Sequence, residues 1–231
     1  MRYGLAVLLL LLSIAAQAET VTLAGRKIQV VLPAGYCKLD RSNPVDAEVI
    51  RVGMSLVDSR TTEVLAIFGA CGELDELRRG RRETLSNYGQ VLAMKTKGEI
   101  VPVANPSRQA FIKQLGNISI DSLVDKNAFE KATKAAEARY RKALNDENVA
   151  LEAQRPSLLH ADANAAYLAV QGRVAEEKDK PYHVFSVMGL TLVNGLVISI
   201  NLCEKFKGIP PVSSVLARQQ KAMAALVAAN P

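Results

Sequence analysis

The chain has 231 residues, 49% of them hydrophobic, and its 29 basic and 23 acidic residues give a net charge of +6 at pH 7. This apolar content is ample for a buried core and excludes an intrinsically disordered chain. The charge is too modest for a nucleic-acid-binding protein, and no motif interleaves aromatic with basic residues, so we expect no nucleic acid partner.

The first 18 residues have the pattern of a secretory signal peptide. Arg2 supplies a short positive region, residues 5–16 form an apolar run, and AQA at 16–18 is a small-x-small cleavage site. The run is shorter than the roughly 20 residues that a membrane-spanning helix needs. Removing the peptide takes away one arginine and no acid, which lowers the net charge to +5. We expect a periplasmic or secreted protein, with one domain over 19–231 and no transmembrane helix in the mature chain.

The first part of the mature chain is predicted to contain a hairpin, a helix and a strand. Residues 19–32 alternate in hydrophobicity on either side of a turn, as two short strands do. Ser42 or Asn43 can cap a helix that begins at Pro44. Residues 63–70 are apolar on both alternating faces, which is typical of a central strand covered by helices on both sides.

Asp46, in the first turn of that helix, is expected to complement the positive end of the helix dipole. A polar segment follows residue 70, and residues 88–95 form the next predicted strand. Glycines and prolines interrupt the segment 97–123, which has no clear periodicity.

The second half of the chain carries stronger signals. Apolar residues recur with a period of 3.6 over 122–148, which predicts a long amphipathic helix. Residues 163–175 are predicted to form a strand. A closing helix is expected to follow Ser213 or Ser214, either of which can cap it, and to dock on the sheet.

Asn194-Gly195, between two β-rich runs, predicts a type I′ hairpin turn. A two-residue turn also determines the register of its strands. The expected pairs are Val193 with Leu196, Thr191 with Ile198 and Gly189 with Ile200. Together these elements predict an α+β fold: an α/β/α sandwich with a mostly antiparallel sheet of about six or seven strands and helices on both faces.

Three cysteines are present, and those of a secreted protein are usually bridged. Cys37 can pair with Cys71, Cys37 with Cys203, or Cys71 with Cys203. If a helical crossover joins two parallel strands that end near Cys37 and Cys71, their carboxyl ends lie on the same side of the sheet, which favours that pair. Cys203 would then be left over, either as a small apolar filler or as a nucleophile or the site of an intermolecular bridge.

The motifs of several enzyme classes are missing. The two histidines, His160 and His183, belong to no metal-ligand spacing, so we expect no metal site. No phosphate-binding glycine motif is present, and we expect no cofactor. No catalytic residue is predicted, although Cys203, or an unpaired Cys37 or Cys71, leaves a thiol-dependent enzyme or redox protein as an alternative.

One arginine-rich segment is a candidate binding site. Arg78, Arg79, Arg81 and Arg82 crowd around Gly80. Guanidinium groups bind phosphates and carboxylates through paired hydrogen bonds, so this arginine loop is a candidate site for an anionic polymer, a headgroup or an acidic protein surface. The alternative is that the neighbouring glutamates and aspartate neutralise the arginines locally.

The order of hairpin, helix, strand, later sheet and closing helix resembles the PsbP-like fold. The stretches GYCKLDRSNPVDAEV, VLAIFGACGEL, NYGQ and TLVNG, with the terminal AAN, are also similar to a group of small secreted proteins of unknown role in Gram-negative bacteria. The second resemblance implies an envelope compartment and the Cys37–Cys71 pairing. PsbP-like domains serve mostly as accessory or assembly subunits, which implies a non-catalytic binding role with an envelope component or a protein partner. A carrier of a small ligand, held between sheet and helix, is a further alternative.

Overall fold

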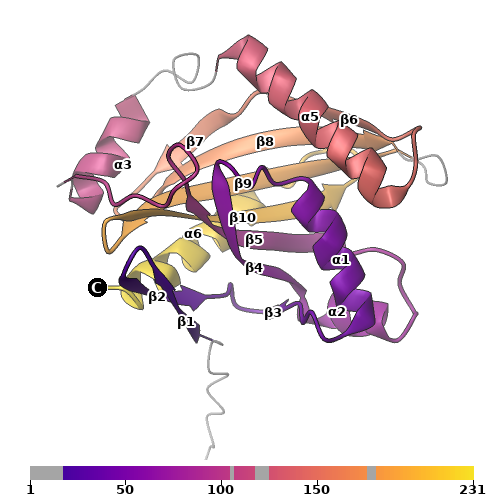
Figure 1. Ribbon diagram of the computed structural model, residues 1–231, viewed down its shortest axis with the longest axis horizontal. Helices are drawn as coiled ribbons and strands as arrows, with labels where there is room; N and C mark the ends of the chain where they lie inside the picture. The colour runs from indigo at the N-terminus through magenta and orange to yellow at the C-terminus, as the bar shows by residue number, and fades with distance from the viewer. Residues whose placement is uncertain (1–17, 105–106, 118–124, 176–180) are drawn as a thin grey trace, which may run out of the picture.

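The computed structural model describes residues 18–104, 107–117, 125–175 and 181–231 (Figure 1). The predicted signal peptide falls, apart from Ala18, outside the described residues. The first elements are β1 (Ala18–Leu23), β2 (Arg26–Val31), β3 (Tyr36–Lys38), α1 (Pro44–Ser55), β4 (Thr62–Ala70), α2 (Cys71–Arg78) and β5 (Asn87–Met94). They are followed by α3 (Arg108–Asn117), α5 (Lys126–Leu144), β6 (Ala150–Ala153), β7 (Ser157–Ala161), β8 (Ala166–Ala175), β9 (Tyr182–Val193), β10 (Leu196–Phe206) and α6 (Val212–Ala228).

The main sheet has, within these ranges, eight strands in the order β3-β4-β5-β10-β9-β8-β6, with β7 also paired to β8. Its neighbouring strands are antiparallel. The hairpin of β1 and β2 forms a separate sheet. The α+β class and the mostly antiparallel sheet are therefore confirmed. The sheet exceeds the predicted six or seven strands because β3, β6 and β7 are too short to show a period in the sequence.

The β9–β10 hairpin has the predicted register. Val193 pairs with Leu196, Thr191 with Ile198 and Gly189 with Ile200. Asn194 and Gly195 both have a positive φ, 48° and 74°, as a type I′ turn requires. These two long strands lie at the centre of the sheet.

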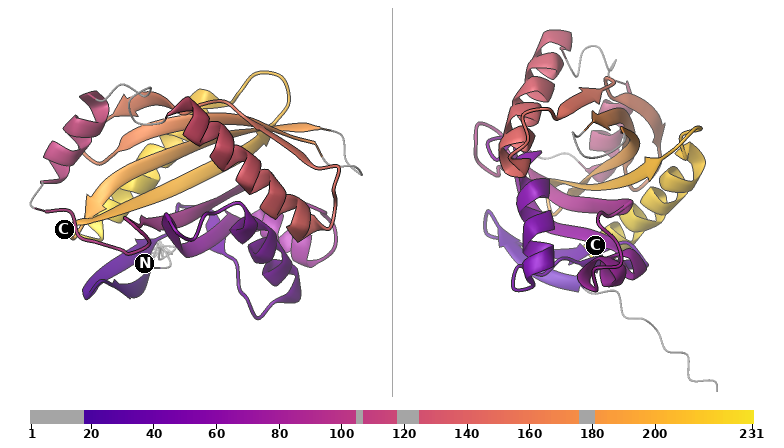
Figure 2. Two further views of the ribbon diagram at one scale, coloured as in Figure 1. Left: turned by 45° about the horizontal axis from the view of Figure 1, so that its top comes forward. Right: turned by 90° about the vertical axis from the view of Figure 1, so that its right-hand side faces the viewer.

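Helices cover both faces of the sheet, and Figure 2 shows α6 on one side of the strands with α1 and α5 on the other. Alternate residues of β4 supply the two cores. Phe68 packs with β2, β10 and α6, whereas Ile67 packs with apolar residues of α1 and α2. No helix in the described part of the chain is long and apolar enough to cross a bilayer.

The helix ends agree with the sequence in part. Asn43 caps α1 by accepting hydrogen bonds from the N–H groups of Val45 and Asp46, and Pro44 occupies the first turn, as predicted. The predicted cap of the closing helix is wrong. That helix follows Pro211 without a side-chain cap, and the Ser214 hydroxyl instead donates to the Pro211 carbonyl at 3.1 Å.

Close packing of α6 on β9 depends on Gly189. A Cβ at this position would lie 2.6 Å from Met223 Cγ and 2.7 Å from Gln219 Nε2, and both side chains are fully buried. The helix therefore approaches the sheet at a distance that only glycine permits.

We expect Gly189→Ala to lower the free energy of unfolding by about 1–3 kcal/mol, because the added methyl group overpacks this interface. Urea denaturation would measure the change. Gly72→Ala, in α2, is the matched control, since a Cβ there meets nothing within 4 Å. Equal stability of the two variants would contradict the packing argument.

Candidate functional site

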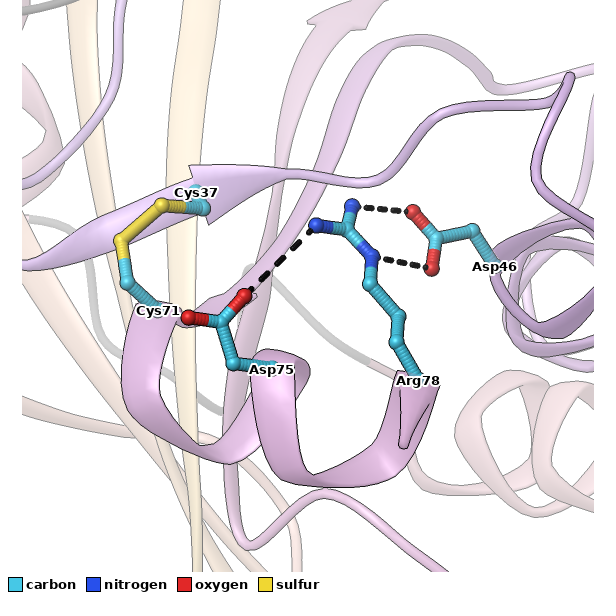
Figure 3. The surroundings of a disulfide bond; sticks show 5 residues. All are labelled: Cys37, Asp46, Cys71, Asp75 and Arg78. Atoms are coloured by element: carbon cyan, nitrogen blue, oxygen red, sulfur yellow. Dashed lines mark hydrogen bonds and ion pairs between the residues drawn. A yellow bond between two sulfur atoms is a disulfide. The ribbon is translucent and has the colours of Figure 1, made fainter. Parts of the chain in front are cut away.

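A disulfide joins Cys37 and Cys71, whose Cα atoms are 4.9 Å apart (Figure 3). This is the pairing that the sequence favours, but the expected parallel crossover is wrong. Strand β3 runs antiparallel to β4, with Cys37 opposite Gly69, and Cys71 begins α2 directly after β4. The two cysteines meet because β3 pairs with the end of β4, and Cys71 is the next residue after that end.

Arg78 is bound to a buried carboxylate on another helix. Its Nε and Nη2 donate to Asp46 Oδ1 at 3.0 Å and Oδ2 at 2.6 Å (Figure 3). Asp46 lies in the first turn of α1, as predicted, and it is fully buried there. Burial raises the pKa of Asp46, but hydrogen bonds from Arg78 and from the Asp40 N–H outweigh this effect, and the pKa is lowered. Arg78 is therefore a structural residue.

Arg82 is also held within the molecule. Its Nε lies 3.2 Å from Glu76 Oε2, and its Nη1 lies 3.6 Å from Glu73 Oε2 and donates to Ser86 Oγ at 3.2 Å. Glu73 in turn accepts hydrogen bonds from the backbone of Ser86 and from Asn87. The local neutralisation considered for the arginine loop thus applies to this arginine.

Arg79 and Arg81 have a different environment. Both are exposed, and neither makes an ion pair with any residue that the structure describes. Gly80, between them, has a φ of 67° and turns the chain away from the end of α2. The loop therefore has two exposed cationic side chains without an ion pair among the described residues.

A cleft of about 450 Å³ adjoins this loop. It lies between the segment that follows the loop and the ends of β9 and β10. Its lining residues are Glu83, Thr84, Ser86, Tyr182, Lys205, Phe206 and Lys207. Lys205 Nζ donates to Thr84 Oγ1 at 3.1 Å and lies 4.0 Å from the centre of the Tyr182 ring. We call Arg79, Arg81, Lys205 and Lys207 the basic rim.

Cys203 is a free, partly buried thiol far in the sequence from the arginine loop. It lies in β10 opposite Ser186, and its Sγ donates to Ser186 Oγ at 3.5 Å. Burial raises the pKa of the thiol to about 11. At neutral pH only about one such thiol in 10⁴ is ionised, which is the opposite of what a nucleophile needs.

The histidines lie apart from one another. His160 stacks against Tyr167 at 6.1 Å between ring centres, and His183 contacts Phe206. Among the described residues, no group of three or more His, Cys, Asp or Glu side chains could hold a metal ion. Sequence reasoning missed Lys205, Lys207 and Tyr182 as neighbours of the segment that follows the arginine loop, because only the sheet brings them there.

Comparisons with known proteins identify no family for this chain. The chain matches no family model and no curated protein sequence. Among solved structures it is similar to the Ran-binding protein Mog1p of Saccharomyces cerevisiae, with 13% identity, over 92% of this chain and 89% of Mog1p. The TM-score of 0.27 is too low to support an argument about fold or activity.

The cysteine chemistry can be tested directly by alkylation and mass spectrometry. In the oxidised native protein at pH 7.5 we expect one free thiol, Cys203, to label about two orders of magnitude more slowly than free cysteine, because its pKa is raised. The rate should rise steeply toward pH 11, and Cys37 and Cys71 should label only after reduction. Rapid labelling of Cys203 at pH 7.5 would show that the thiol is activated.

Proposed function

We propose that the protein is a non-catalytic binding or accessory protein of the periplasm or of the secreted fraction, and that the basic rim contacts an anionic envelope component. This proposal rests on a difference among the four arginines of the arginine loop. Two arginines are held by internal acids, while Arg79 and Arg81 project without an ion pair in the described part of the chain.

The neighbouring side chains support the same partner class. Lys205 and Lys207 add two cations beside the cleft, and the hydroxyl groups of Thr84 and Ser86 add polar contacts. Cations on an exposed edge attract phosphate and carboxylate groups, and the attraction weakens as salt is added. Glu83 is the acid that lines the cleft, so the rim remains net positive.

Two resemblances of the sequence point to the same class of role. The similarity to small secreted Gram-negative proteins implies the compartment, and the PsbP-like order of elements implies an accessory subunit. The high pKa of Cys203 disfavours the thiol-dependent alternative.

A small-ligand carrier is a second candidate, because one cavity does lie between sheet and helix. It has a volume of about 580 Å³ and is lined by β4, by Ile50 of α1 and by the loop between β3 and α1.

The proposed contact can be tested with the mature chain and isolated envelope fragments. We expect the double variant Arg79→Gln/Arg81→Gln to weaken co-sedimentation about 10- to 30-fold at low salt, because each cation near an anionic surface contributes roughly 1 kcal/mol. High salt should weaken binding of the unaltered protein in the same way.

The matched control is Lys113→Gln/Lys134→Gln, which removes the same charge from exposed positions on α3 and α5. It should bind nearly as well as the unaltered protein. Equal losses for the two double variants would mean that only net charge matters, and no loss for either would remove the basic rim as the contact.

A further inference from the structure

The loop between β10 and α6 carries exposed apolar side chains. Ile209 lies in this loop and is 90% exposed, and Val212, the first residue of α6, is 37% exposed. Among the described residues only two other large hydrophobic side chains, Leu56 and Val101, are exposed, and both lie far away in the sequence. The exposed apolar side chains are thus concentrated in one short segment. We call residues 208–212 the apolar tip.

The backbone of the apolar tip is restrained. Gly208 has a φ of 80°, in the left-handed region that favours glycine. Pro210 and Pro211 restrict their own φ angles, and the Pro210 carbonyl accepts the N–H of Val212 at 2.9 Å. Because the tip is already ordered, contact with a partner costs little backbone entropy.

The surroundings of the apolar tip are positively charged. Residues 205–212, KFKGIPPV, contain two lysines and no acid, and the two lysines outnumber Glu83 in the adjoining cleft. Lys207 is exposed and has no ion pair with a described residue. The acid just before this segment, Glu204, is paired with Arg218. Helix α6 begins at the tip without a side-chain cap, so the positive end of its dipole adds to the same field.

An aliphatic side chain next to cations is suited to the surface of a bilayer. Cations bind the phosphate groups of anionic lipids, and an apolar side chain that reaches past the headgroups enters the acyl region. A stable protein interface needs about 1,000 Å² of complementary surface, which is far more than two apolar side chains provide. A bilayer requires no complementary pocket, so the size of the tip favours lipid over protein.

We propose that the apolar tip inserts Ile209 into a bilayer that contains anionic phospholipid, while Lys207 binds lipid phosphate groups. This names the anionic component that the basic rim contacts, and it rests on the proposed function because Lys207 belongs to that rim. One inserted side chain with a few cations gives reversible attachment to the surface.

The first test places a fluorescent probe at the tip. The chain contains no tryptophan, so Ile209→Trp supplies a single indole at the proposed contact. With vesicles of phosphatidylcholine and phosphatidylglycerol in a seven-to-three ratio, its emission should shift to the blue and be quenched by brominated acyl chains, because the indole enters an apolar region. An unchanged spectrum would overturn the proposal.

Val101→Trp is the matched control. Val101 is also exposed, but it lies close in the chain to Val103, whose N–H bonds to the Gly195 carbonyl just before β10. Ile209 follows the other end of this 11-residue strand, which is roughly 35 Å long. The control indole should show neither shift nor quenching. Equal responses at both positions would mean that lipid binding does not use the tip, and would overturn the proposal.

The second test is co-sedimentation of the mature chain with the same vesicles. Ile209→Ser should weaken binding about tenfold, because it removes the inserted aliphatic side chain. The variant should unfold in urea at the same concentration as the unaltered protein, since the side chain is exposed. Vesicles of phosphatidylcholine alone should bind the unaltered protein about tenfold more weakly than the anionic vesicles. Equal binding in either comparison would contradict the proposal.

Envelope fragments separate failure of this inference from failure of the proposed function. If the unaltered protein binds the vesicles but Ile209→Ser binds them equally well, the basic rim acts by charge alone and only insertion is removed. If the fragments bind and the vesicles do not, the component is not lipid, and loss of binding after protease treatment of the fragments would identify it as protein. If neither binds, both proposals are removed.

Discussion

The ion pair between Asp46 and Arg78 joins three segments of the chain at one buried carboxylate. Asp46 begins α1, Arg78 ends α2, and the same carboxylate accepts the N–H of Asp40 in the loop after β3. A fully buried carboxylate is costly unless charged or polar partners surround it, and here both are supplied. The Cys37–Cys71 disulfide links β3 to α2 covalently and closes a loop of 34 positions, worth about 4 kcal/mol in the chain-entropy model.

This ion pair determines which arginines of the arginine loop stay exposed. Because Arg78 is paired with Asp46, the arginine loop presents fewer unpaired cations than its sequence suggests. The Asp40 N–H also donates to Asp46, which holds the loop after β3 against the start of α1.

The sequence predicted the elements whose signals are local. Asn194-Gly195 determined the hairpin register, and Asn43 with Pro44 marked the start of α1. Elements that depend on distant partners were missed. Strand β3 is too short to show a period, and α2 was hidden in a charged segment that starts at a cysteine. The role of Arg78 could not be read from the sequence, since its partner is 32 residues away and becomes buried only when α1 and α2 pack.

The most direct test of this account is a double-mutant cycle on Asp46→Asn and Arg78→Gln, with free energies of unfolding from urea denaturation. We expect a coupling energy of about 3 kcal/mol at pH 7. The pKa of Asp46 is lower in the folded protein than in the unfolded chain, so this stabilisation is complete at neutral pH and is lost as the pH falls through the folded value. A coupling energy near zero at pH 7 would contradict the account, because Arg78 would then be as free as Arg79 and Arg81.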